Sequence, residues 1–257
     1  MSILRVVDTG LQPPRRNIAM TAALAELHAA GKIPDTLRFQ RFEPCVLVGR
    51  NQDVDREVRL DRCRQGGVAL ARRVTGGGAV YMDAGILSWE IVAGRRRFGA
   101  DLTAAAEKIC TAVAEGLAAL GAPAQFSPPN AVEAEGRKLC GASGYFEGAT
   151  LVYEGTVLVD FDLGTMAAVL CLPGETGPAA LAERVTSLAK LLGRAPAIDE
   201  VMRALAATIS NRFCFSLFAA PLSPRELRLA EALHAAEFGT DRFVFGEDEG
   251  GEIRRRA

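Results

Sequence analysis

Hydrophobic residues along this chain alternate with polar ones or form short apolar runs, and both patterns predict β-strands. The segments concerned are residues 3–8, 36–42, 45–48, 68–73, 86–92, 131–135, 137–140 and 150–161. After Pro128 and Pro129 the strand-like segments are separated only by short turns, so we expect an antiparallel meander in that part of the chain.

A helical period appears in further segments. Asn17 is expected to cap a first helix that ends at Gly31 and has Met20, Leu24 and Leu27 on one face, and residues 59–64 form a short charged helix. A long helix runs from Asp101 to Gly121, with Ile109, Val113, Leu117 and Leu120 along one stripe. A further helix carries Val201, Leu205 and Ile209, and a capping box at Ser223 opens a last helix over 224–238. Because helices and meander strands are segregated, we expect an α+β fold: mixed, largely antiparallel β-sheets flanked by helices.

Composition narrows the class of protein. The 257 residues, 49% of them hydrophobic, are enough for one large domain with a substantial core. The formal net charge of −1 gives no general attraction to nucleic acid or to an anionic membrane. Because the chain starts without the pattern of a secretion signal and has no apolar run of membrane-spanning length, we expect a cytoplasmic protein. The scattered cysteines and two histidines do not indicate a zinc site or a histidine triad.

Two glycine-flanked segments are the candidate chemistry. Gly76–Gly78 follow a strand-like run that ends in Arg72 and Arg73. Glycine lets the backbone approach a ligand closely, and arginine binds carboxylate or phosphate through two parallel hydrogen bonds, so this segment predicts a cradle for an acidic ligand. The alternative is a tight turn flanked by solvated charges. In the second segment Lys138 lies between glycines, in a chain with four lysines and 26 arginines, which indicates a site that needs a compact ammonium.

With both segments in view, the chain resembles the lipoate-protein ligase A family, whose fold is shared with biotin-protein ligases. The matching residues, in family order, are Gly49-Arg50-Asn51-Gln52, Arg72-Arg73, Gly76 to Tyr81 with Asp83, Asn130, Gly136-Arg137-Lys138 with Gly141 and Ser143, Glu154 to Asp160, and Arg184 to Leu188. They cover roughly residues 3 to 245 in consistent spacing, which is more specific than any one motif.

The resemblance implies an enzyme that joins lipoate or octanoate to ATP as an acyl-adenylate and passes the acyl group to a lysine of a lipoyl-accepting protein. It gives Lys138 the catalytic place, touching the α-phosphate and the acyl carbonyl oxygen, and makes Arg72 a phosphate clamp. The residues implied to bind ATP and the acyl group are Arg50, Arg72, Gly76, Gly77, Gly78, Ala79, Val80, Tyr81, Asn130, Gly141, Ser143, Gly155 and Thr156. Mg²⁺ is expected with ATP; its protein ligands are unknown, with Asp83 and Asp160 as candidates.

Two other readings stay open. Octanoyl or lipoyl transferases of the same fold carry the acyl group on a cysteine upstream of the lysine, but residues 127–136 contain no cysteine here. Cys140 lies two residues from Lys138, so on a regular strand it would face the same side, where an ammonium could lower the pKa of its thiol. The third reading is a lipoyl-domain-binding subunit that needs a partner, since Met82, Ala131 and Glu154 depart from the family pattern.

For domain organisation we expect a catalytic domain over residues 1–220, followed by a C-terminal helix and flexible tail over 221–257. Full-length ligases of the family often carry an additional accessory domain, for which these residues leave no room. Either a separate small accessory protein completes the enzyme or the large domain suffices. The run Arg95–Arg97 is expected to be a solvated face.

Overall fold

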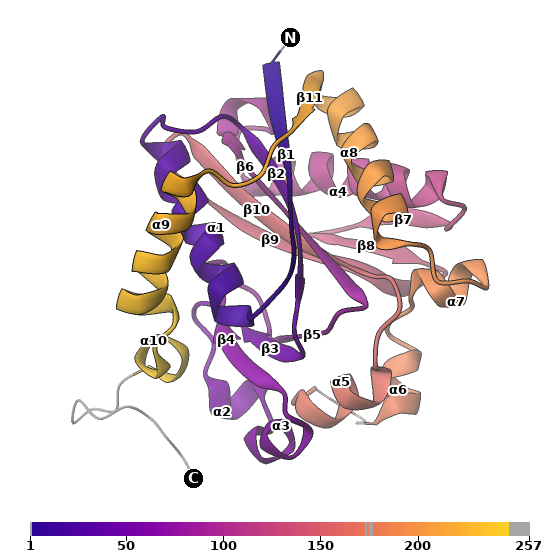
Figure 1. Ribbon diagram of the computed structural model, residues 1–257. Coiled ribbons are helices and arrows are strands. Elements are labelled where there is room, and N and C mark those ends of the chain that lie inside the picture. Colours follow the sequence, from indigo (N-terminus) through magenta and orange to yellow (C-terminus); the bar gives the residue numbers. More distant parts are fainter. Residues whose placement is uncertain (1, 173, 175–176, 247–257) are drawn as a thin grey trace.

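The computed structural model describes residues 2–172, 174 and 177–246. Within this part of the chain, a large eight-stranded sheet has the order β11-β1-β2-β6-β10-β9-β8-β7, and a small three-stranded sheet has the order β4-β3-β5 (Figure 1). The strands are β1 Ser2–Gln12, β2 Thr36–Phe42, β3 Cys45–Val48, β4 Ala69–Arg72, β5 Val80–Met82, β6 Ile86–Gly94, β7 Ala124–Ser127, β8 Ala131–Ala134, β9 Arg137–Glu147, β10 Thr150–Leu158 and β11 Phe215–Ala219. Within the large sheet, the neighbouring strands from β2 through β6, β10, β9 and β8 to β7 pair antiparallel. Strand β1 pairs in parallel with β2 and with β11.

Helices cover both faces of the large sheet. They are α1 Pro14–Ala29, α2 Val54–Glu57, α3 Leu60–Gly66, α4 Leu102–Ala119, α5 Leu163–Val169, α6 Pro178–Ala182, α7 Leu188–Leu192, α8 Ile198–Phe213, α9 Pro224–Leu233 and α10 Asp241–Phe245, with a 3₁₀ turn at Arg95–Arg97 and a π-helical turn at His234–Phe238. Helix α1 packs on β2, β6 and β10, and α9 packs on α1; α4 packs on β7, β8 and β9, with α8 against it (Figure 1). The predicted α+β fold is therefore confirmed.

The two faces of the large sheet differ in polarity. Thr21 of α1 donates a hydrogen bond to Glu90 of β6, which is paired across the sheet with Glu154 of β10. The neighbouring residue on β10, Tyr153, points the other way and contacts Cys110 of α4, because successive strand residues face opposite sides. Aromatic and aliphatic side chains fill the α4 side, and a buried polar group lies on the α1 side.

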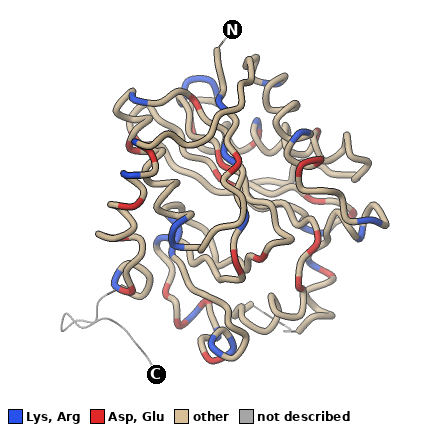
Figure 2. The backbone as a smooth tube through the Cα atoms, in the orientation of Figure 1, with Lys and Arg blue, Asp and Glu red and all other residues tan. Residues whose placement is uncertain are grey.

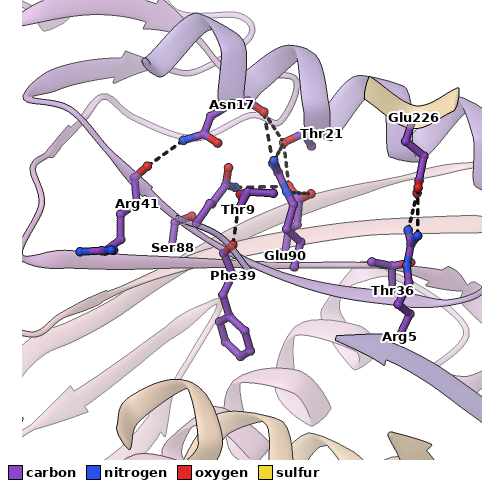
Figure 3. Close-up of polar contacts among 12 residues, drawn as sticks. Arg5, Thr9, Asn17, Thr21, Thr36, Phe39, Arg41, Ser88, Glu90 and Glu226 are labelled. Atoms are coloured by element: carbon purple, nitrogen blue, oxygen red, sulfur yellow. Dashed lines mark hydrogen bonds and ion pairs between the residues drawn. The ribbon is translucent and has the colours of Figure 1, made fainter. Parts of the chain in front are cut away.

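That polar group is centred on a buried ion pair. Arg38 donates to Glu90 at 2.7 Å and to Thr21 at 2.8 Å, and both members of the pair are fully buried. Figure 3 shows Asn17 and Thr21 on the helix above Glu90 of the sheet. The expectation that Asn17 caps this helix is wrong: the helix begins at Pro14, and Asn17 lies inside it, donating to the carbonyl of Arg41 at 2.8 Å. A proline in the first helical position was the available signal.

The other predicted helices are confirmed with small changes at their ends. Asp101 caps α4 by accepting from the Ala104 N–H, and Ser223 opens α9 with the expected capping box. The last predicted helix stops being α-helical at Leu233 and continues as the π-helical turn. The flexible tail expected at the end of the 221–257 segment lies outside the described residues from 247 onward.

The segment after residue 220 packs as part of the main body. Glu226 of α9 is buried and accepts two hydrogen bonds from Arg5 of β1, and Ala230 packs with Met20 of α1. A division of the chain at residue 220 therefore does not follow a packing boundary. Positive and negative side chains are interspersed along the backbone (Figure 2). Among the described helices, none has the length and hydropathy needed to cross a bilayer.

Candidate active site

A cavity of about 540 Å³ opens between β9 and β10 of the large sheet, the triple-glycine segment that leads into β5, and helices α5 and α6. It brings together residues that are far apart in the sequence. The predicted site residues that line it are Gly76, Gly77, Gly78, Ala79, Val80, Tyr81, Asn130, Lys138, Gly141, Ser143, Gly155 and Thr156. Arg50 and Arg72 do not line it.

Lys138 enters this cavity from β9. Its backbone donates to the Arg184 carbonyl at 2.9 Å and accepts from the Thr186 N–H at 3.0 Å, which fixes its position on the strand. The side chain lies over Gly141: a Cβ built there would be 2.7 Å from Cε and 2.9 Å from Nζ of Lys138. Gly141 is therefore glycine because the lysine occupies the space of a side chain. Among the described residues, no carboxylate forms an ion pair with Lys138, so its charge faces the cavity.

The triple-glycine segment forms another part of the cavity wall, and hydrogen bonds to its backbone carbonyls hold it in place. Arg73 is buried and donates to the carbonyls of Leu47 at 2.7 Å, Gly76 at 2.9 Å and Gly78 at 3.0 Å. Gly77 has φ +95°, a conformation that favours glycine. A Cβ on Gly49 would lie 1.8 Å from the Gly77 carbonyl oxygen, so Gly49 lets the two backbones touch.

Arg72 does not reach the cavity as the predicted phosphate clamp. Its guanidinium donates hydrogen bonds to backbone carbonyls of two segments. These are the loop after β3, at Gly49, Arg50 and Gln52, and helix α10, at Phe243 and Val244. These hydrogen bonds use the guanidinium to fasten the loop after β3 to α10. Arg50 is exposed and lines, with Arg72, a separate hollow beside that helix.

Gly155 and Asn130 border the cavity, and each has a structural role there. A Cβ on Gly155 would lie 2.4 Å from a ring carbon of Trp89, so its missing side chain points into the core on the α4 side and only its backbone borders the cavity. Asn130 donates from Nδ2 to the Ala142 carbonyl at 2.6 Å and thereby ties the start of β8 to β9.

Cys140 does not face the same side as Lys138. The pairing of β8 with β9 shifts register between Val132 and Glu133, opposite Lys138 to Cys140, so the regular alternation is broken. The thiol is 1% exposed, and burial raises the pKa of Cys140 far more than the nearby Lys138 lowers it. The lowered pKa that the transferase alternative would need is therefore not found at Cys140.

Glu154 is a buried carboxylate of the cavity wall, and its residue type departs from the family pattern. Thr75 donates to its Oε1, Ser143 donates to Thr75 at 3.0 Å, and Arg73 Nε lies 3.8 Å away. Burial raises the pKa of Glu154, while Arg73 and the Thr75 hydrogen bond act in the opposite direction. Met82, the second departure, is fully buried in the core, and Ala131 pairs with Gly141.

Much of the cavity wall is apolar and comes largely from segments outside the predicted site residues. Its apolar residues include Leu47, Leu158, Met166, Leu170, Leu172, Leu181 and Val185. The apolar run around Met166 to Leu172 was the available signal. A cation, a stretch of glycine backbone and an aliphatic wall in one cavity together suit an acid with a long apolar chain, with its carboxyl group at Lys138.

The described residues offer no ready Mg²⁺ site. No group of three or more His, Cys, Asp or Glu side chains gathers in them, and Glu154 is the one carboxylate of the cavity lining. Asp83, a candidate, instead accepts from the backbone N–H groups of Gly85 at 2.9 Å and Asp162 at 3.0 Å. The described residues therefore do not fit a resident metal.

Comparisons with known proteins agree with this geometry. The chain is 28% identical over 264 residues to an octanoyltransferase LipM of Symbiobacterium thermophilum, covering 92% of this chain and 96% of the relative. It superimposes on a crystal structure of lipoate-protein ligase A bound with ATP with a TM-score of 0.84 and 27% identity, covering 95% and 98% of the two chains. A bi-partite lipoate protein ligase of Thermoplasma acidophilum, studied with its E2 lipoyl domain, gives a TM-score of 0.82 and 27% identity over 100% and 98%. The model of the lipoyl protein ligase A/B catalytic domain matches residues 13–210, so the chain belongs to this family.

Proposed function

We propose that this enzyme is an ATP-dependent lipoate-protein ligase. It activates lipoate or octanoate as an acyl-adenylate, with release of pyrophosphate, and transfers the acyl group to a lysine of a lipoyl-accepting protein. The observation that carries the proposal is the lone ammonium of Lys138 in a cavity whose only lining cysteine, within the described residues, is the buried Cys140. A site without a reactive thiol must activate the acid by other means, and adenylation supplies a good leaving group.

The residues would divide the work as follows. The aliphatic part of the cavity wall, including Met166, Leu170 and Leu181, would hold the acyl chain. The backbone of the glycines at 76–78 would lie along the nucleotide phosphates. The Lys138 ammonium would lie between the acyl carbonyl and the α-phosphate, where its attraction strengthens as negative charge develops on those oxygens. The enclosed apolar walls would limit hydrolysis of the mixed anhydride.

The relatives bear on partners as well. Because a relative of nearly the same length is one part of a bi-partite ligase that acts with a lipoyl domain, we propose a lipoyl domain as acceptor and a separate small accessory protein as a second subunit. Cytoplasmic location and Mg²⁺ carried by ATP belong to the same proposal.

The second candidate is an octanoyltransferase that acts through a thioester, favoured by the name of the LipM relative. The test is to incubate the purified protein and a lipoyl domain either with ATP, Mg²⁺ and lipoate or with octanoyl-carrier protein alone. The ligase predicts lipoyl-AMP, pyrophosphate and a modified domain in the first mixture only. Modification in the second mixture, without nucleotide, would contradict it and support the transferase.

A further inference from the structure

Three side chains form a hydrogen-bonded chain from the cavity into the protein. Ser143 Oγ donates to Thr75 Oγ1 at 3.0 Å, and Thr75 Oγ1 donates to Glu154 Oε1. Ser143 and Glu154 both line the cavity and are direct partners on β9 and β10, while Thr75 is 1% exposed and lies just before the triple glycine. Since both hydroxyl protons point inward, the free lone pairs of Ser143 are left to accept a proton from the cavity side.

The inner end of the chain is suited to accept a proton. Arg73 lies near Glu154 from the loop after β4; Glu90 of β6 is its cross-strand partner; Arg38 of β2 and Tyr145 of β9 lie farther along the same face. Burial is the largest influence and raises the pKa of Glu154, Glu90 raises it further, and Arg73, Thr75 and Arg38 oppose the rise. The carboxylate therefore takes up a proton more readily than an exposed glutamate does.

Acyl transfer to a protein needs such a group. A lysine amine has an ordinary pKa of about 10.4, so only about one in a few thousand is uncharged near pH 7. Lys138 is itself a cation and cannot take the proton. Within the described lining of the cavity, Glu154 is the only carboxylate.

We propose that Ser143, Thr75 and Glu154 form a proton relay that deprotonates the acceptor lysine as it attacks the acyl group. Ser143 is the member that touches the substrate, and Glu154 acts through the two hydroxyl groups. The inference rests on the proposed function in one respect: the acyl acceptor is an amine.

The acceptor ammonium gives one proton to Ser143 Oγ, the serine proton passes to Thr75 Oγ1, and the threonine proton passes to the Glu154 carboxylate. The freed nitrogen lone pair forms the bond to the acyl carbon, and the bond from that carbon to the phosphate oxygen breaks with its electron pair on the oxygen. The second nitrogen proton leaves with the AMP phosphate. The products are the amide, AMP and a neutral Glu154, which returns its proton to solvent between turnovers.

The experiment separates the two half-reactions. The wild-type protein is first loaded with lipoyl-adenylate from ATP, Mg²⁺ and lipoate, then mixed with excess lipoyl domain, and single-turnover transfer is followed from about pH 6 to about pH 9. We expect Thr75→Val, Glu154→Gln and Ser143→Ala to slow transfer at about pH 7 by on the order of a hundredfold, the usual share of a positioned proton acceptor. Their rates should rise about tenfold per pH unit, as the free amine fraction does, while the wild-type profile stays flatter.

Three controls distinguish loss of the relay from general damage to the structure. Thr75→Ser retains the hydroxyl and should keep the wild-type pH profile. Ser88→Ala removes another buried hydroxyl hydrogen bond, to the Gly155 carbonyl, outside the relay and should also keep it. Adenylate formation removes no proton from an amine, so each variant's transfer rate is compared with its own rate of adenylate formation, and transfer should fall by the larger factor. Ser143 is only partly buried, so its variant should fold.

The outcomes are distinct. If Thr75→Val and Ser143→Ala transfer with the wild-type pH profile, or if the relay variants lose adenylate formation and transfer equally, the relay is refuted and these residues only position the loop. If the wild-type protein forms no adenylate, the proposed function fails, and the same profiles measured with an octanoyl thioester donor still test the relay.

Discussion

At the scale of the residue, we propose that Lys138 carries the chemistry, because it is a compact cation that enters the cavity beside a glycine. Lys138→Ala should lower adenylate formation by a factor on the order of a hundred to a thousand, the usual effect of losing one preorganised donor to a developing charge. Lys138→Arg should not restore the rate, because the space above Gly141 is already filled by Cε and Nζ. Pyrophosphate release measures the rate, and thermal unfolding is the control.

Since the Lys138 side chain is exposed to the cavity, both variants should unfold at the wild-type temperature. An alanine variant that still forms lipoyl-AMP at the wild-type rate would exclude this role for Lys138.

Single residues also show what the sequence could and could not predict. Lys138 and the glycines could be predicted as site residues because their local pattern is unusual, and the structure brings them to one cavity. Arg72 was assigned as a phosphate clamp because nothing local tells it from Arg73, and only the fold shows that its donors go to backbone carbonyls on α10. The cross-strand contact that makes Ser143, Thr75 and Glu154 a chain joins residues up to 79 positions apart, so no local pattern contains it.

At the scale of the element, the triple-glycine segment depends on close backbone packing against the end of β3. Gly49→Ala should destabilise the protein by about 2 kcal/mol and weaken lipoate and nucleotide binding, because the new Cβ would overlap the Gly77 carbonyl. Gly66→Ala is the matched control, since its Cβ would make only an ordinary contact with Val68, at 3.6 Å. Urea unfolding and ligand binding by calorimetry measure both effects.

The control at Gly66 should be neutral or slightly stabilising, because alanine favours a helix end over glycine. Equal stability and equal binding for the two variants would mean that the glycine segment tolerates displacement.

The sequence predicts secondary-structure elements well where the hydrophobic period is long, as in α4. It misses helices that are short, such as α5, α6 and α7. Short helices carry too few periods to be seen, and their positions come from packing around the cavity.

At the scale of the whole molecule, the first strand β1 and helix α9 are joined by the buried pair of Arg5 and Glu226. Burial raises the pKa of Glu226, but its hydrogen bonds from Arg5 and Ser223 outweigh this, so the pKa is lowered from its ordinary value of 4.5. A lowered pKa contributes stability that is present above the ordinary value and is lost as the pH falls through the folded-state value.

Glu226→Gln should therefore cost about 3 kcal/mol near neutral pH, because Arg5 is left buried without its charged partner. The difference between wild type and variant should shrink below about pH 4.5. Urea unfolding at a series of pH values measures it. A difference that stays constant with pH, or no difference at neutral pH, would mean that the pair does not hold α9 to β1.

We propose that the activated acyl group is held non-covalently at Lys138 and is never bonded to the enzyme. The most direct test of this proposal is the intact mass of the denatured protein after single-turnover reaction, with ATP, Mg²⁺ and lipoate in one sample and with octanoyl-carrier protein in another. The account predicts an unchanged protein mass in both and lipoyl-AMP released from the first. A protein heavier by one acyl group, with the addition lost in Cys140→Ala, would contradict it.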